Sequence, residues 1–338
     1  MSAPTSYIAA LGVFLPERTR TTKQTELDLR QGNPGLKLAT GLIHRLTGVE
    51  SVHIRDDDWQ TSDLALAAAR TALEESPGDI DLVIFASASQ DLIEPATSHI
   101  LAAKLGLDCP VMDVKNACNS MLNGMQVADA LISSGQYRRV LIASGEAPTS
   151  GVRWQLADHQ QFIRSFPGYT MSDGGAAVIL EKNSREDAAA PGIVDSTFLA
   201  VSKHWDIGTL PTGGSVNPRG GDDSFFDMDG AGLQAAFLEL GPQPVMDLLE
   251  RNGLGWDDFD LVAIHQVALP YLPPIFERLG VAGDKSVVIV AEHGNLASVG
   301  LPLQLQLARE QGKVGPGSLV LLIGLAGGIS LGLMVVRL

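Results

Sequence analysis

The fold of this chain is decided by a short stretch, Asp79–Val83, with the sequence Asp-Ile-Asp-Leu-Val. A near copy, Asp-Phe-Asp-Leu-Val, returns 179 residues later at Asp258–Val262. A second apolar run, Val140–Ile142, has its copy 180 residues later at Val320–Leu322. Because a solenoid would repeat at a much shorter period, two copies at one long offset predict two similar halves.

Strands and helices alternate around the first copy. Apolar runs predict strands at Leu82–Phe85, Val111–Val114 and Val140–Ala143. Amphipathic spacing predicts helices at Thr61–Leu73 and Asn119–Ser133. Alternation of this kind predicts an α/β fold, and we expect a strand and then a helix between the copied runs of the second half as well.

A polar stretch, Glu181–Gly192, separates the two copies, so we expect the halves to be residues 1–183 and 184–338. Two segments fit neither half, Gly151–Tyr169 and Ser202–Asp229, and they hold many of the aromatic residues. Such segments are either substrate walls or surface excursions with a small core of their own.

Composition excludes several classes of function. The 338 residues carry a net charge of −15, which argues against nucleic acid or an anionic membrane as the main partner. The uncharged run Ser318–Val336 contains four glycines, which predicts two strands joined by a glycine turn instead of a membrane span. The N-terminus shows no signal peptide, so we expect a cytoplasmic protein. Cys109 and Cys118 form no CxxC pair, so neither a disulfide framework nor a metal site is expected.

Three residues can carry nucleophilic chemistry. Cys118 follows a predicted strand and opens a helix, whose positive end would lower the thiol pKa; otherwise it is a small core residue. His265 ends a strand and is either a proton-transfer or oxyanion group or a satisfied core histidine. Asn295 precedes a helix and is otherwise a simple cap. Cys118 and Asn295 lie 177 residues apart, which predicts that they open equivalent helices facing one cleft.

Several motifs together resemble the thiolase-like condensing enzymes, specifically the β-ketoacyl synthase III group, over nearly the whole chain. The matching pieces are Asn116–Ser120, Ser172–Ala177, Phe226–Gly230, His265-Gln266, Gly294–Ser298 and Ala326–Ser330. The resemblance implies a five-layered αβαβα sandwich of two pseudo-symmetric halves and a homodimer. It implies no permanently bound cofactor, with acyl-coenzyme A (acyl-CoA) or acyl-carrier-protein thioesters as substrates.

The resemblance also implies a catalytic triad of Cys118, His265 and Asn295, with an oxyanion hole from the backbone N–H groups of Cys118 and Gly327. An acyl-cysteine would form first, and a carbanion from a second thioester would then attack it. The stretch after His265 departs from the housekeeping enzymes and lacks their arginine, which favours specialised lipid or polyketide metabolism. The segment Asp91–Pro95 is similar to the long-chain condensing enzymes of olefin biosynthesis, in which a glutamate, here Glu94, serves the partner subunit as a base. Alternatively, Glu94 only enters a helix ahead of Pro95.

Two other functions stay open. A related acyltransferase would move the acyl group from Cys118 to a hydroxyl or amine, and a catalytically silent protein of this fold would only bind. Cationic and aromatic residues in the irregular segments are expected to line the mouth and meet coenzyme phosphates; singly, each is otherwise a solvated surface residue. They are Arg153, Arg164, Lys203, Arg219 and Phe225.

Overall fold

Two mixed sheets form the frame of the chain, described by a computed structural model at residues 3–185, 187, 189–221 and 224–338. The first sheet has the order β1-β7-β6-β4-β5, and the second has the order β11-β12-β13-β8. The strands of the first sheet are β1 (Ser6–Phe14), β4 (Leu82–Ala86), β5 (Val111–Val114), β6 (Arg139–Glu146) and β7 (Gly174–Lys182). Those of the second are β8 (Gly192–Ala200), β11 (Leu261–Ile264), β12 (Leu319–Ala326) and β13 (Ser330–Arg337). Two small pairs complete the strands: β2 (Thr19–Thr21) with β3 (Ser51–His53), and β9 (Gly208–Thr209) with β10 (Asp227–Met228).

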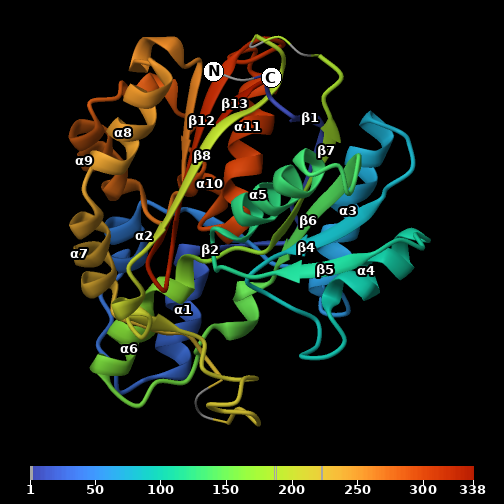
Figure 1. Cartoon of the computed structure of the whole chain (residues 1–338). Helices are drawn as coiled ribbons and strands as arrows, with labels where there is room; N and C mark the ends of the chain where they lie inside the picture. The colour runs from blue at the N-terminus through green and yellow to red at the C-terminus, as the bar shows by residue number, and fades with distance from the viewer. Residues whose placement is uncertain (1–2, 186, 188, 222–223) are drawn as a thin grey trace.

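Helices cover both sheets and fill the space between them. The helices are α1 (Thr22–Gly32), α2 (Leu42–Thr47), α3 (Thr61–Glu75), α4 (Thr97–Leu105), α5 (Ser120–Ser133), α6 (His159–Ser165), α7 (Gly230–Leu240), α8 (Gln243–Asn252), α9 (Leu272–Leu279), α10 (Val290–His293) and α11 (Gly300–Glu310). Figure 1 shows α3 and α4 outside the first sheet, α8 and α9 outside the second, and α5 with α11 between the sheets. This order confirms the predicted αβαβα sandwich. The largest apolar core lies in the middle layer, where side chains of both halves pack together.

The repeated Asp-x-Asp-Leu-Val stretch has the same structural task in each half. The Asp81 N–H donates to the Arg139 carbonyl oxygen at 2.9 Å, and the Asp260 N–H donates to the Leu319 carbonyl oxygen at 2.9 Å. Each carboxylate then accepts from the backbone N–H of that same partner residue. The second aspartate of each copy therefore sets the register of a parallel strand pair, β4 with β6 and β11 with β12.

One predicted strand of the second half is missing. Val287 and Ile289 are buried, but the described residues 287–289 join no sheet. The Gln266 side chain takes up their backbone groups instead, donating to the Val287 carbonyl oxygen at 2.7 Å and accepting from the Ile289 N–H at 2.9 Å. An amide side chain thus replaces the strand partner that β5 has in the first half.

The uncharged run Ser318–Val336 is the β12–β13 hairpin, as predicted. Within the described ranges, no helix combines the length and apolar character needed to cross a membrane. The halves divided at residue 183 stay a prediction; β7 ends at Lys182, β8 begins at Gly192, and residues 186 and 188 between them lie outside the described part.

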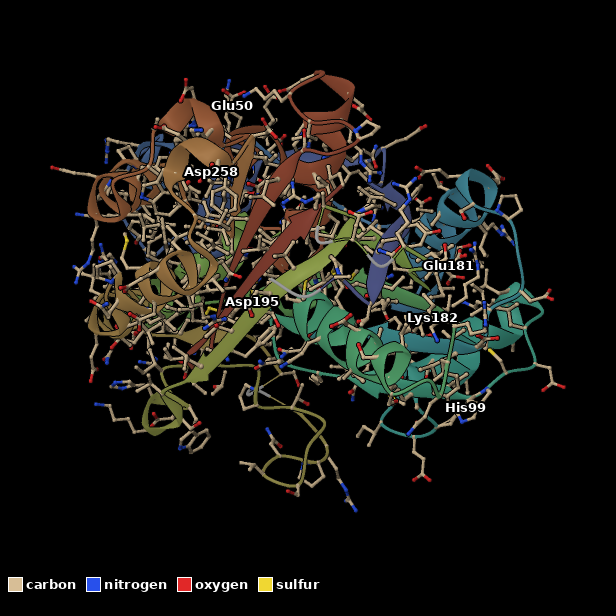
Figure 2. The ribbon with its side chains drawn as sticks, turned by 45° about the horizontal axis from the view of Figure 1, so that its top comes forward. Glu50, His99, Glu181, Lys182, Asp195 and Asp258 are labelled. Atoms are coloured by element: carbon tan, nitrogen blue, oxygen red, sulfur yellow. The ribbon has the colours of Figure 1, made fainter. Side chains whose placement is uncertain are left out.

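The outer surfaces are fixed by polar side chains. Asp195, labelled on β8 in Figure 2, accepts hydrogen bonds of 2.6 Å from both Arg251 and Asn252 and so holds α8 on the second sheet.

The irregular segment Gly151–Tyr169 shares a small apolar core with Leu29 of α1 and Ile43 of α2, and within it Phe162 and Tyr169 stack with ring centroids 5.9 Å apart. Residues 222–223 of the other irregular segment lie outside the described chain.

Candidate active site

A tight turn carries Cys118 from β5 into α5. Ala117 has a backbone φ of +44°, a left-handed value that costs an L-residue roughly 1–2 kcal/mol. The turn is closed by the Asn119 N–H donating to the Asn116 carbonyl oxygen at 3.0 Å. The Ser120 hydroxyl adds a 2.7 Å hydrogen bond to the Ala117 carbonyl oxygen. Strained backbone of this kind clusters at functional sites, which supports Cys118 as a reactive residue.

The Cys118 thiol is not the activated thiolate that its place before a helix predicts. Burial, followed by the negative charge of nearby Glu146, raises the pKa of Cys118 to about 12. The α5 helix begins only at Ser120, so the sulfur lies outside the first turn, where the field of a helix is strongest. The predicted lowering of the thiol pKa is therefore wrong, and the residue is a thiol at neutral pH.

The residue after Cys118 clamps this turn onto the β12–β13 turn of the other half. The Asn119 amide donates to the Ser330 carbonyl oxygen at 3.1 Å and to the Ser330 hydroxyl at 2.9 Å. Asn119 also lies against Gly324, where an added Cβ would sit 2.0 Å from the Asn119 Oδ1. These contacts bring the turn that contains Gly327 beside Cys118. Ile329 in that turn has φ +41°, so it is strained like Ala117.

His265 directly follows β11, and a backbone hydrogen bond fixes its position. Its N–H donates to the Ile323 carbonyl oxygen at 2.8 Å, so it lies beside the strand residue that precedes Gly324. The side chain is buried, and burial lowers the pKa of His265 to about 4. At neutral pH the imidazole is uncharged, which suits it to donate a hydrogen bond to a developing oxyanion and makes it a weak base.

Asn295 lies in a turn that is fixed on both sides. Its N–H donates to the Thr170 carbonyl oxygen at 2.8 Å, and its own carbonyl oxygen accepts from the Ser172 N–H at 2.9 Å. The side-chain Oδ1 accepts from the Ala297 N–H at 3.0 Å, and the amide NH₂ group forms no hydrogen bond with the described residues. Because α11 begins only at Gly300, Asn295 is not the cap of that helix.

The predicted equivalence of Cys118 and Asn295 is wrong by three residues. The α5 and α11 helices begin at Ser120 and Gly300, which are 180 positions apart. Ala117 and Ala297 share the same offset, and their φ values are +44° and +50°. The counterpart of Cys118 in the second half is therefore Ser298. The short helical turn Ala297–Val299 packs against both α5 and β6, so the Asn295 segment does reach the same interface between the halves.

Glu94 is not joined to these residues within the chain. It is exposed in the loop after β4, beside Leu92 and Ile93, which are 52% and 69% exposed. Across the described residues it forms no hydrogen bond or ion pair with the other candidates.

Two cavities are relevant to the candidate residues. One of about 250 Å³ lies beside the Cys118 turn and the glycine turn, and Asn116, Gly328 and Ser330 contribute to its wall. A second, of about 220 Å³, is lined by Arg153 and Arg164. No group of three or more metal-ligating side chains occurs in the residues that the structure covers.

The predicted binding residues divide between two places. Arg164 forms an ion pair with Asp227, and the Arg153 guanidinium lies 4.8 Å from the ring centroid of Phe225. Lys203 pairs with Glu239 on the surface, at 2.6 Å, and Arg219 is exposed. Arg153, Arg164 and Phe225 thus form one group, and Lys203 and Arg219 do not line its cavity.

Sequence reasoning missed the polar residues that support the site. Asn119, Ser298 and Ser330 lie inside the motifs described above but no role was predicted for them, and Glu146 lies outside every motif. The one available signal was an acidic residue ending the apolar run of β6, Val140–Glu146, which is unusual for a strand buried along its length.

Comparison with known proteins gives consistent results. Residues 112–199 match the family model described as 3-oxoacyl-(acyl-carrier-protein (ACP)) synthase III, and residues 249–338 match the model of its C-terminal part. A β-ketoacyl-(acyl-carrier-protein) synthase III of Nitratidesulfovibrio vulgaris strain DP4 is 30% identical over 346 residues, which cover 100% of both chains.

Solved structures show the same fold. An OleA variant from Xanthomonas campestris superposes with a TM-score of 0.89, 24% identity and 100% coverage of both chains. A 3-oxoacyl-(acyl carrier protein) synthase III, FabH, from Xanthomonas oryzae pv. oryzae gives the same three values. These likenesses confirm the thiolase-like fold implied by the sequence motifs.

Proposed function

The chain belongs to the β-ketoacyl-(acyl-carrier-protein) synthase III family of acyltransferases, and from that premise we propose that Cys118, His265 and Asn295 are its catalytic triad. The observation that carries this proposal is the clamp from Asn119 to Ser330. It supports an oxyanion hole, which requires the backbone N–H groups of Cys118 and Gly327 beside one another.

The first stage is acyl transfer to Cys118. The sulfur attacks the thioester carbonyl carbon, a new C–S bond forms, and the negative charge on the oxygen is held by the N–H groups of Cys118 and Gly327. The C–S bond of the donor then breaks. Because the raised pKa of Cys118 leaves the resting sulfur protonated, the S–H bond must break as the sulfur attacks, and its proton passes to the donor sulfur, so that coenzyme A or the carrier protein departs as a thiol.

The second stage forms the carbon–carbon bond. A carbanion from a second thioester attacks the acyl carbon, and its enolate oxygen needs two hydrogen-bond donors before the attack. The neutral His265 ring supplies one, and the Asn295 NH₂ group supplies the other, since its Oδ1 is already occupied by Ala297. Each such donor is typically worth about 3 kcal/mol in the transition state.

Intact-mass spectrometry with a panel of acyl-CoAs tests the proposal. We expect an adduct of the acyl mass on the wild-type chain and none on Cys118→Ala. Products with a new carbon–carbon bond support condensation, whereas esters or amides would assign the chain to transfer onto a hydroxyl or amine. Absence of any adduct on the folded protein would contradict an enzymatic role for Cys118.

Glu94 is proposed to act in a homodimer, as the base for a condensation that needs no decarboxylation in specialised lipid or polyketide metabolism. The support is its place directly after the exposed Leu92 and Ile93, and the outer position of β5 in its sheet, an open edge for a second chain. A crystal structure of Xanthomonas campestris OleA holds lauric acid and lauroyl-CoA, which makes long-chain acyl-CoAs the first substrates to try.

Light scattering and a Glu94→Gln variant test that role. We expect a dimer in solution, normal acylation of Cys118 by the variant, and loss of condensation. A monomer, or unchanged condensation by the variant, would remove Glu94 from the mechanism.

Arg153 and Arg164 are proposed to meet the coenzyme phosphates at the second cavity, and Phe225, which stacks on Arg153, is proposed to meet the adenine. Arg153→Ala should raise the KM for acyl-CoA several-fold without changing the acylation of Cys118 by a short acyl thioester that lacks the nucleotide. Lys203→Ala is the matched control, because Lys203 lies outside this cavity. Equal effects of the two variants would leave the cavity without a role.

A further inference from the structure

Two histidine side chains that are 240 residues apart in sequence meet beside the turn that carries Asn295. The His53 Nε2, on β3, lies 3.0 Å from the Nδ1 of His293, the last residue of α10. The ring planes are 17° apart and the centroids 5.3 Å apart. That separation is the full reach of two rings joined through a 3.0 Å contact, so the rings meet edge to edge and share a hydrogen bond.

The partners of the two rings decide which nitrogens carry hydrogen. The His53 Nδ1 lies 2.7 Å from the Pro16 carbonyl oxygen, which can only accept, so this nitrogen donates. Burial, and after it the nearby His53 ring, lower the pKa of His293, so the His293 ring is uncharged at neutral pH. With both rings uncharged, the His53 Nε2 accepts and the His293 Nδ1–H donates, which makes both residues Nδ1–H tautomers.

These bonds close a circuit around Asn295. The His53 N–H donates to the Ser172 hydroxyl at 2.7 Å, and the Ser172 N–H donates to the Asn295 carbonyl oxygen at 2.9 Å. On the other side, His293 is joined to Asn295 through Gly294 alone. The path that leaves Asn295 through Ser172 and returns through His293 therefore consists of three hydrogen bonds and one glycine.

Gly294 is the joint of this circuit. Its φ is +66°, and an added Cβ would sit 2.6 Å from the Thr170 carbonyl oxygen and 2.8 Å from the Val52 Cγ1, so the position requires glycine. Because glycine is conformationally permissive, the direction in which the chain leaves it depends on how its neighbours are held. The residue before the joint, His293, is held by its side chain, and the residue after it is Asn295.

The bond between the histidines is not what holds α10 on β3. The Glu50 N–H donates to the Ala291 carbonyl oxygen at 2.7 Å, and the Ser51 hydroxyl donates to the Glu292 carbonyl oxygen at 2.8 Å. Both bonds lie further from Asn295 in sequence, and neither uses an imidazole. A role of the histidines in placing Asn295 can therefore be separated from a role in folding.

We propose that His53 and His293 are positioning residues that hold the Asn295 amide in its productive direction toward the enolate oxygen. They act through the Gly294 joint and not on the substrate. Without their bond the turn can take other directions, and a donor that is misplaced by even a small distance stabilises the transition state much less. Because acyl transfer to Cys118 uses other donors, the effect is confined to the second stage. This inference rests on the proposed role of Asn295.

Two variants of one residue separate the hydrogen bond from the packing. His293→Leu fills a similar space without a donor, and His293→Asn keeps an N–H group near the place of Nδ1. With lauroyl-CoA as the probe, intact-mass spectrometry follows acylation of Cys118, and product formation follows condensation. Asn295→Ala is the reference for loss of the amide. His44→Leu is the matched control, because its Nδ1 also lies near a carbonyl oxygen, that of Val49 at 3.2 Å, but outside the circuit.

We expect His293→Leu to acylate Cys118 at the wild-type rate and to condense about tenfold or more slowly. His293→Asn and His44→Leu should keep most of the condensation rate. Equal losses in His293→Asn and His293→Leu overturn the proposal, and so does a parallel fall of both stages. If Asn295→Ala loses condensation and His293→Leu does not, only this proposal is overturned. If Asn295→Ala condenses normally, the proposed role of Asn295 fails and this proposal fails with it.

The tautomers give a second measurement that needs no substrate. NMR of the protein labelled with ¹⁵N-histidine distinguishes Nδ1–H from Nε2–H rings at neutral pH. We expect the Nδ1–H form for both His53 and His293, assigned through the signals that disappear in His53→Gln and His293→Asn. An Nε2–H ring at His293 overturns the proposal, and this result decides the matter if His293→Leu does not fold.

Discussion

The nucleophile turns of the two halves have one backbone and two chemistries. Ala117 and Ala297 are both left-handed, and a helix begins three residues after each. In the first half the turn carries Cys118 and faces Gly324. The Asn119 side chain occupies the space that a side chain at position 324 would need. In the second half it carries Ser298 and faces the acidic end of β6.

The difference teaches that the fold alone does not make a nucleophile. The strand facing each turn decides what its side chain can do, because a glycine turn offers N–H donors to an oxyanion whereas a carboxylate repels one. The first half therefore holds the proposed reaction site, whereas in the second half the equivalent residue, Ser298, is bound in a buried hydrogen-bond network.

The largest expected effect comes from removing the sulfur. Cys118→Ala should lower the rate of condensation by about 10⁴-fold or more, since the acyl-cysteine cannot form and binding alone supplies little of the rate. Product formation from acyl-CoA measures this. Cys109→Ser is the control and should keep the wild-type rate, because Cys109 lies at the edge of another core. Comparable losses of rate in both variants would contradict the proposal that Cys118, and not Cys109, is the nucleophile.

The next largest effect is a pH dependence of the folding stability, which arises from His265 in the second half. Burial lowers the pKa of His265 to about 4, below its value of about 6.5 in the unfolded chain. Between these two values the unfolded chain binds a proton that the folded chain does not, so stability falls as pH falls. The full loss is about 3 kcal/mol.

Urea unfolding between pH 7 and 4 measures this loss. His265→Asn should show a shallower fall than the wild type, because the remaining titrating groups, including the partly buried His293, are unchanged. Identical slopes in the two proteins would show that His265 is solvated and charged in the folded state.

Much of the fold was predictable because its signals are local. Asp81 and Asp260 repeat a hydrogen-bonding task, so the repeat was visible in the chain itself. The missing strand at 287–289 was not predictable, because its backbone is satisfied by the side chain of Gln266, which lies more than 20 residues away.

The sequence points to the residues proposed as reactive but not to the residues that support them. Cys118 and His265 follow strands, and the motifs around them are specific. The roles of Glu146 and Asn119 depend on contacts of more than 150 residues in sequence separation, with Ser298 and Ser330. The prediction of a lowered Cys118 pKa was wrong for the same reason. Burial of the thiol and the charge of Glu146 raise this pKa more than the end of helix α5 lowers it, and no local sequence pattern reveals either cause.

A smaller effect tests the close approach at Gly324. In Gly324→Ala the new Cβ would meet the Asn119 Oδ1 at 2.0 Å and the Leu122 Cδ1 at 2.8 Å. We expect a loss of about 1–3 kcal/mol in unfolding free energy, measured by urea titration. Gly315→Ala is the control, because nothing lies within 4 Å of its Cβ position. Adding Asn119→Ala should recover part of the loss, and a double variant no better than the single one would mean that the clamp is not the obstacle.

The smallest effect compares the two turns directly. Glycine relieves about 1–2 kcal/mol of left-handed strain but loses roughly 0.5–1 kcal/mol to the greater freedom of the unfolded chain. Ala117→Gly and Ala297→Gly should therefore each raise the unfolding free energy by about 0.5–1 kcal/mol, as measured by urea titration. Ala67→Gly in α3 should lower it by about 1 kcal/mol, because helix interiors disfavour glycine. A gain in one turn with a loss in the other would show that the two halves do not share the strained backbone, and the comparison between them would then rest on helix position alone.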